Sequence, residues 1–230
     1  MDIILVPGLW LDASSWVNVA SSLEAAGHRA RAVTLPGVGE SAASSADIGI
    51  ADWVDAVVAQ IDAGGDPVVL VGHSGGGNVV WGAADARPNR VARVIFVDTV
   101  APPSDAAISE FPVVDGVIPF PGWEFFPEED VHDIDAATRA RTLPLTKSVP
   151  ARVPTDPIEL TGGRHRVPVT MLMGSIDQQE LEVQLDQWGP YADEYRALHD
   201  VTVTKIGSGH WPQFTQPVRL AELISAAATQ

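Results

Sequence analysis

The stretch VLVGHSGGGNVV, residues 69–80, decides the fold because it places one serine among four glycines, between two apolar runs. The first apolar run predicts a buried strand, and the second predicts a helix. Gly72, Ser74 and Gly76 match the pattern Gly-x-Ser-x-Gly at their junction. A sharp turn there lifts a serine hydroxyl clear of the backbone and needs glycines where strand and helix approach closely. The pattern therefore predicts that Ser74 is a nucleophile.

Two other interpretations of this stretch are weaker. Ser74 as a simple helix cap fits the five-residue pattern alone, but the strand and helix predicted on either side favour the nucleophile. A phosphate-binding loop needs a Lys followed by Ser or Thr, and a dinucleotide-binding loop needs a different glycine spacing. Neither feature is present in the stretch.

Strands and helices alternate along most of the chain. Predicted strands cover residues 3–6, 28–35, 66–72, 91–99, 167–174 and 201–207, and predicted helices cover residues 16–26, 50–61, 75–85, 181–188 and the end of the chain from 217. Several of the strands are apolar throughout, which is typical of a parallel sheet covered on both faces. We expect an α/β fold with a mostly parallel central sheet flanked by helices.

The alternation is interrupted at residues 101–165, which are rich in Pro and aromatic residues. We expect one domain over residues 1–230, with residues 101–165 as a lid inserted after the strand that ends near Asp98. The acidic group at residues 128–135 fits a solvated helix start better than a metal site. No metal ion is therefore expected.

Composition narrows the range of partners. The formal net charge is −16, with 14 basic residues against 30 acidic ones, which argues against nucleic acid. No Cys is present, so disulfides and thiolate chemistry are excluded. A strand is predicted at the very start, and no apolar run approaches the ~20 residues of a membrane span. We expect a cytoplasmic protein acting on a small molecule; the oligomeric state is not indicated.

A nucleophilic serine needs a base and an acid to orient that base. His210 follows the last predicted strand, so it lies at the same sheet edge as Ser74 and is the expected base. Asp177 and Asp98 both follow strands between Ser74 and His210 in chain order, as the acid does in this architecture. We favour Asp177, which follows the strand before the histidine strand, and keep Asp98 in reserve. His73 is next to the nucleophile but is expected to point away from it, and the remaining four are expected to be surface or structural histidines: His28, His132, His165 and His199.

Two backbone N–H groups are expected to form an oxyanion hole, from Gly75 after the nucleophile and from Leu9 in the loop after the first strand. Aromatic residues near these loops and in the lid either line a substrate pocket or form a small core under the lid. The candidates for the pocket wall are Trp10, Trp211, Phe120, Trp123 and Phe125.

Over nearly its full length the chain resembles the α/β-hydrolase superfamily, and within it the small esterases that include plant methylesterases and hydroxynitrile lyases. The likeness rests on the stretch around Ser74 and on supporting segments: ILVPGLWLDASSW (4–16), EAAGHRARAVTLPGVGES (24–41), FVDTVAP (96–102), GSIDQ (174–178) and GSGHW (207–211). The resemblance implies a triad of Ser74, Asp177 and His210.

The chain departs from that group at several points. Pro7-Gly8 stands where His-Gly is usual in the loop after the first strand, so we expect this loop to be held in place by other contacts than in that group. Trp211 stands where the hydroxynitrile lyases carry a lysine suited to a cyanide leaving group, which favours hydrolysis over carbon–carbon cleavage. A serine nucleophile also excludes the branches that attack with aspartate. Residues 102–165 match nothing in the group, so the resemblance does not identify a substrate.

The resulting prediction is a serine hydrolase that cleaves a small-molecule carboxylic ester, or a related acyl bond, through an acyl-enzyme and without a cofactor. Two alternatives remain open. One is a carbon–carbon lyase like the hydroxynitrile lyases, and the other is a non-catalytic ligand-binding protein on the same fold.

Overall fold

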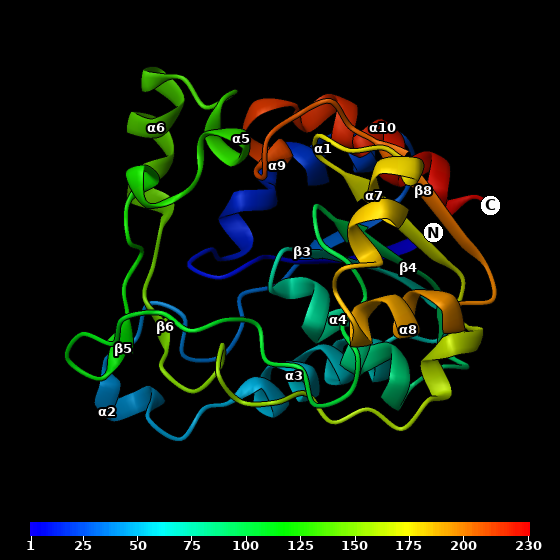
Figure 1. Cartoon of the computed structure of the whole chain (residues 1–230), viewed down its shortest axis with the longest axis horizontal. Helices are drawn as coiled ribbons and strands as arrows, with labels where there is room; N and C mark the ends of the chain where they lie inside the picture. The colour runs from blue at the N-terminus through cyan, green and yellow to red at the C-terminus, as the bar shows by residue number, and fades with distance from the viewer.

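A six-stranded parallel sheet forms the centre of the molecule. The computed structural model describes all 230 residues, and the strand order is β2-β1-β3-β4-β7-β8 (Figure 1). The strands are β1 (Asp2–Val6), β2 (Arg29–Ala32), β3 (Val68–His73), β4 (Val91–Val97), β7 (Val169–Met173) and β8 (Val201–Lys205). Every neighbouring pair is parallel, so the carboxyl ends of all six strands lie at one edge.

Helices cover both faces of this sheet. In Figure 1, α1 and α10 lie on one side, and α3, α4 and α8 lie on the other. The helices are α1 (Val17–Ala25), α2 (Ala42–Ser45), α3 (Ile50–Asp62), α4 (Gly76–Ala86), α5 (Glu128–Val131), α6 (Ala136–Thr142), α7 (Gln178–Leu185), α8 (Pro190–Ala197), α9 (Pro212–Thr215) and α10 (Pro217–Ala228). Short 3₁₀ turns lie at Ala13–Trp16, Trp123–Phe125, Leu143–Leu145 and Gly163–Arg166.

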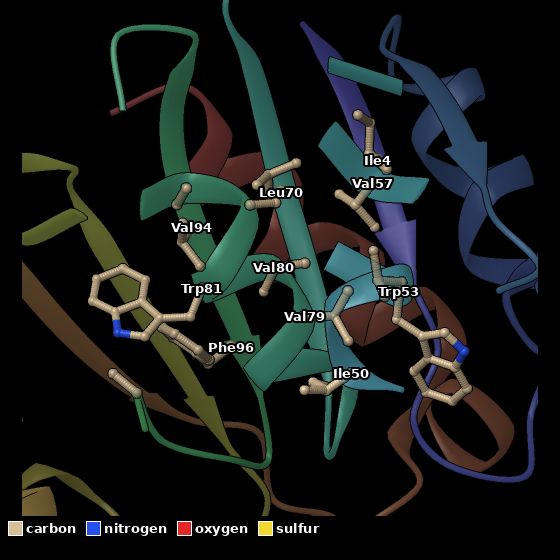
Figure 2. Packing of buried hydrophobic residues seen from close by; sticks show 14 of the residues in the cluster. Ile4, Ile50, Trp53, Val57, Leu70, Val79, Val80, Trp81, Val94 and Phe96 are labelled. Atoms are coloured by element: carbon tan, nitrogen blue, oxygen red, sulfur yellow. The ribbon is translucent and has the colours of Figure 1, made fainter. Parts of the chain in front are cut away.

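The two faces of the sheet bury separate hydrophobic clusters because successive strand residues point to opposite sides. In β1, Ile3 and Leu5 pack with α1 and α10, whereas Ile4 and Val6 pack with α3 and α4. Figure 2 shows the second cluster, in which residues of α3 and α4 lie against the strands: Ile50, Trp53, Val57, Val79, Val80 and Trp81 against Ile4, Leu70, Val94 and Phe96. Burial on both faces explains why these strands are apolar throughout.

The expected fold class is confirmed, and each predicted strand matches an observed one within a few residues at either end. The helix predicted at residues 181–188 differs from the observed one in its bounds. The observed helix α7 ends at Leu185, and a separate helix, α8, begins at Pro190. Gly189 between them has a φ of 53°, a left-handed conformation that glycine adopts without strain. This Gly-Pro pair ends one helix and starts the next.

The long connection between β4 and β7, residues 101–165, contains short elements and no part of the main sheet. It holds α5, α6 and a two-stranded antiparallel pair, β5 (Val117–Ile118) and β6 (Val149–Pro150). A small cluster packs α5 against the loops that follow β1 and β8: Leu11, Trp123, Val131, Ile134 and Trp211. The connection therefore lies over the carboxyl edge of the sheet. No helix of the chain combines the length and apolar character that crossing a bilayer demands.

Candidate active site

Ser74 occupies the tight turn between β3 and α4. Its φ is 50°, which is unusual for a residue other than glycine. Its N–H donates to the carbonyl of Val97 at 3.1 Å, and its own carbonyl accepts from Gly77 at 2.8 Å. A Cβ on Gly72 would lie 2.5 Å from the carbonyl oxygen of Gly76, so the turn closes only because position 72 has no side chain. The backbone hydrogen bonds hold this strained conformation in place.

His210 and Asp98 form a close pair. His210 Nδ1 lies 2.6 Å from Asp98 Oδ2, and the other carboxylate oxygen of Asp98 accepts from the N–H of Gly174 at 2.6 Å. Burial acts to raise the pKa of Asp98, but the hydrogen bond and charge of His210 and the N–H of Gly174 outweigh it. The pKa of Asp98 is therefore below its usual value, and the carboxylate is ionised where it can orient the imidazole.

Asp177 makes no hydrogen bond or ion pair with His210. The preference for Asp177 over Asp98 as the acid that orients His210 is therefore wrong. Its Oδ1 accepts from the N–H of Glu180 at 2.9 Å, and Glu180 Oε2 accepts from the N–H of Asp177 at 2.8 Å. These two bonds form a capping box at the start of α7. Asp98 directly follows β4, which is the neighbour of the Ser74 strand β3 in the sheet, whereas β7 is one strand farther away.

A cavity of about 260 Å³ brings the predicted groups together. Ser74, Asp98 and His210 line it, as do Leu9 and Gly75. The backbone N–H groups of Leu9 and Gly75 donate to no acceptor within the protein. All five residues thus line one cavity, and two of them carry a backbone N–H that has no acceptor within the protein.

The aromatic residues divide between the cavity and the packing around it. Trp10 and Trp211 line the cavity as expected, together with Phe111, Phe126 and Tyr191. The other three predicted residues do not line it. Phe120 and Trp123 pack into the cluster under the connection: the Trp123 ring makes edge-to-face contacts with Phe120 and with Trp211, with ring centroids 5.0 Å apart in each pair. Phe125 is exposed to solvent.

His73, next to the nucleophile, holds the loop that carries His210. Its Nε2 lies 2.7 Å from the backbone carbonyl of His210, and because a carbonyl only accepts, this nitrogen carries the proton. Burial, followed by the charge of His210, lowers the pKa of His73 to about 3. A neutral His73 thus anchors the His210 loop. The remaining histidines lie outside the cavity, with His28 bonded to Ser225, His132 to Glu129, and His165 to Glu194.

Several cavity residues were missed by the sequence reasoning, and two of them, Asn78 and Asp130, carry polar side chains that make no hydrogen bond within the protein. Asn78 lies one turn after Ser74 on α4; the residue is 7% exposed, and its amide makes no hydrogen bond within the protein. A polar residue between the glycines and the apolar run of that helix was the available signal. Asp130 of α5 also lines the cavity, and its carbonyl accepts the backbone N–H of His210 at 2.8 Å. Nothing in the acidic run around Asp130 distinguishes it by sequence.

Comparison with known proteins identifies the family of the chain. A family model described as the alpha/beta hydrolase family matches residues 3–223. The chain belongs to this family.

Members of this alpha/beta hydrolase family with known names resemble the chain to different extents. A carbendazim hydrolyzing esterase from Nocardioides is 27% identical over 243 residues, covering 97% of this chain and 98% of that protein. The rice esterase PIR7B is 39% identical over 104 residues, but the match spans only 43% of this chain and 38% of the relative. The chain thus aligns with well under half of the rice protein's length.

Solved structures of the alpha/beta hydrolase family confirm the fold. An extracellular alpha/beta-hydrolase from a Paenibacillus species superposes with a TM-score of 0.79 at 21% identity, covering 100% of both chains. A methylesterase from Arabidopsis superposes with a TM-score of 0.75 at 18% identity, covering 100% of this chain and 99% of the other. At these identities, the likeness shows the shared architecture.

Proposed function

We propose that this chain is a serine hydrolase that cleaves small-molecule carboxylic esters with Ser74, His210 and Asp98. The observation that carries the proposal is the contact of 2.6 Å between His210 Nδ1 and Asp98 Oδ2, in the wall of the cavity that Ser74 also lines. The names of the relatives support it, since they include esterases and plant methylesterases. Here Asp98 replaces Asp177 as the proposed third member of the triad.

The proposed reaction proceeds in two stages. In the first, Ser74 Oγ attacks the ester carbonyl while His210 Nε2 accepts the hydroxyl proton, and His210 then returns the proton to the leaving alcohol. In the second, His210 activates a water molecule that attacks the acyl-enzyme, and the acid is released. Asp98 holds the imidazole with Nε2 toward Ser74 and stabilises the imidazolium that forms.

The developing oxyanion needs donors that are free before the reaction begins. The N–H groups of Leu9 and Gly75 meet this requirement, because neither donates elsewhere in the protein. In this proposal they bind the oxyanion of the tetrahedral intermediate. Removing one such donor costs about 10²–10³-fold in turnover in serine hydrolases.

The experiment that tests this function compares the native chain with Ser74→Ala on p-nitrophenyl esters from acetate to decanoate. We expect hydrolysis well above background for the native chain and none for the variant. A cavity of about 260 Å³ is small for a ligand site, so the rate should fall as the acyl chain lengthens.

A fluorophosphonate probe provides a second readout that does not depend on the ester chosen. We expect it to label Ser74 in the native chain and to leave Ser74→Ala unlabelled. An inert native chain that also resists the probe would instead indicate a ligand-binding protein on the same fold.

A further inference from the structure

Asp130 of α5 is the starting point, because it lines the cavity of the proposed active site. The Asp130 carbonyl is tied to the N–H of His210 at 2.8 Å. A Cβ on Gly209 would lie 2.3 Å from that same carbonyl oxygen, so backbone meets backbone here without room for a side chain. The position of Asp130 relative to His210 is therefore set by the backbone rather than by a flexible side-chain contact.

The wall of the cavity contains acidic groups and no Lys or Arg. Asp98 is paired with His210, and His73 is neutral at ordinary pH because its pKa is about 3. Asp130 has no hydrogen bond or ion pair to its carboxylate within the protein. It is half-buried. A carboxylate that remains unpaired in a partly enclosed space attracts a cation and repels an anion.

The charges of His210 and Asp98 act on the Asp130 carboxyl, which lines the same cavity. Burial raises its pKa, the charge of His210 opposes that rise, and the charges of Asp98 and Glu129 add to it. The carboxylate thus interacts with both members of the His210–Asp98 pair. A substrate bound at Ser74 is within reach of the same field.

Aromatic rings also line the cavity that Asp130 lines. Phe126 packs edge-to-face against Trp211, with ring centroids 4.7 Å apart, and Trp10 packs edge-to-face against Phe126 at 5.8 Å. All three rings line the cavity. A cavity that combines aromatic rings with an unpaired carboxylate offers an ammonium group cation–π and Coulomb attraction together.

From these observations we infer that Asp130 is a specificity-determining residue, and that the site prefers esters carrying an ammonium group over neutral esters of the same shape. The inference rests on the proposed function, since it names the substrate class of that site. Asp130 takes no part in bond making or breaking. It acts on the affinity for the charged part of the substrate.

The size of the preference follows from the exposure of Asp130. Two unit charges a few ångströms apart attract strongly in a dry interior, but solvent screens a half-buried group. We therefore expect the native chain to prefer the cationic ester by about tenfold in kcat/KM.

The test uses acetylcholine and its neutral carbon isostere, 3,3-dimethylbutyl acetate, with acid release followed in a pH-stat. The two esters share the acyl group and the shape of the alcohol, so their kcat/KM ratio isolates charge. At about 0.5 M salt, where the field of distant charges is screened, we expect about a tenfold ratio in the native chain and a ratio near one in Asp130→Asn. Glu128→Gln is the matched control, because it removes an exposed charge of α5 that does not line the cavity; its ratio should equal the native one.

A binding measurement separates failure of this inference from failure of the proposed function. Choline and 3,3-dimethylbutan-1-ol are titrated into Ser74→Ala, with and without Asp130→Asn, and the fluorescence of the cavity residues Trp10 and Trp211 is followed. Tighter binding of choline that Asp130→Asn removes supports the inference even if neither ester is hydrolysed. Equal binding of both alcohols, or a native kcat/KM ratio near one, overturns it whether or not the chain is an esterase.

Discussion

Three non-glycine residues of the cavity wall hold a backbone conformation that usually belongs to glycine. The φ values are 65° at Trp10, 50° at Ser74 and 47° at Asp98. Each follows the carboxyl end of a strand: β1, β3 and β4, which are neighbours in the sheet. Such conformations cost of order 1–3 kcal/mol each and persist where the surroundings determine them fully. The sheet edge is therefore strained at the point where the proposed chemistry takes place.

Replacing the orienting acid tests the assignment at residue scale. Asp98→Asn should lower kcat by about 10⁴-fold, because the amide cannot stabilise the imidazolium and favours the wrong tautomer of His210. Asp177→Asn should leave kcat nearly unchanged, since Asp177 only caps α7. Steady-state kinetics on one p-nitrophenyl ester measures both. Equal losses in the two variants would refute this assignment.

His73 makes stability depend on pH in a definite direction. Its pKa is about 3 in the folded chain and about 6.5 when unfolded, so the unfolded chain binds more protons between those values. Stability should therefore fall as the pH is lowered through this window, by up to about 1.4 kcal/mol per pH unit from this residue. Urea unfolding at about pH 6 and about pH 4 should show a smaller loss for His73→Gln than for the native chain. Identical losses would mean that His73 is not buried in its neutral form.

At the scale of elements, α5 is docked on the His210 loop through Gly209. A Cβ at this position would lie 2.3 Å from the carbonyl oxygen of Asp130 and 2.6 Å from Asp133 Oδ1. Gly209→Ala must therefore move α5 or the loop, and we expect kcat to fall at least tenfold because both carry site residues. Gly65→Ala is the matched control, since nothing lies within 4 Å of its added Cβ. A fully active Gly209→Ala would show that the loop tolerates the shift.

A buried ion-pair network joins α4, the long connection and α8. Arg164 donates to Glu194 through Nε at 2.7 Å and through an Nη at 2.6 Å, and it lies 3.3 Å from Asp85. Trp81 also donates to Glu194, at 2.9 Å. Glu194 is one turn from Tyr191, so the network fixes the helix that supplies this part of the cavity wall.

Breaking this network should lower the free energy of unfolding more than breaking an exposed ion pair does. Glu194→Gln leaves Arg164 buried with one carboxylate fewer, and we expect a loss of about 3–5 kcal/mol in the free energy of unfolding. Asp186→Asn, which breaks an exposed pair with Arg196, should cost about 0–1 kcal/mol. Urea denaturation compares the two variants directly. A small loss in the free energy of unfolding for Glu194→Gln would mean that water reaches the guanidinium of Arg164 and solvates its charge.

The sequence predicted the elements that local patterns determine. The apolar strands, the turn at Ser74 and the place of His210 all depend on residue type and spacing, and the structure matches them. The choice between Asp98 and Asp177 depends on which strands are neighbours, and chain order alone does not determine that. One local signal was available: Asp177 and Glu180 have the spacing of a capping box. The placing of Asp130 in the cavity needed the packing of the long connection, which no sequence period encodes.

At the scale of the whole molecule, the net charge of −16 reinforces the local preference inferred for Asp130. A surplus of negative charge attracts a cationic ester from a distance and raises its rate of encounter, while a neutral ester is unaffected. Salt shortens the reach of this field from roughly 30 Å at 0.01 M to about 3 Å at 1 M. The contribution of distant charges should therefore disappear at high salt, and the part due to Asp130 should persist longer because it acts at short range.

Ionic strength thus separates the field of the whole chain from the effect of one residue. We expect kcat/KM for acetylcholine to fall several-fold between about 0.01 M and about 0.5 M salt, while that for 3,3-dimethylbutyl acetate stays nearly constant. In Asp130→Asn, kcat/KM for acetylcholine should still fall with salt, because most of the negative charge of the chain is still present. The preference for acetylcholine over the neutral ester that the native chain keeps at high salt should be lost in this variant. If both esters respond to salt alike, the surface charge has no part in substrate capture, and any preference comes from the cavity wall alone.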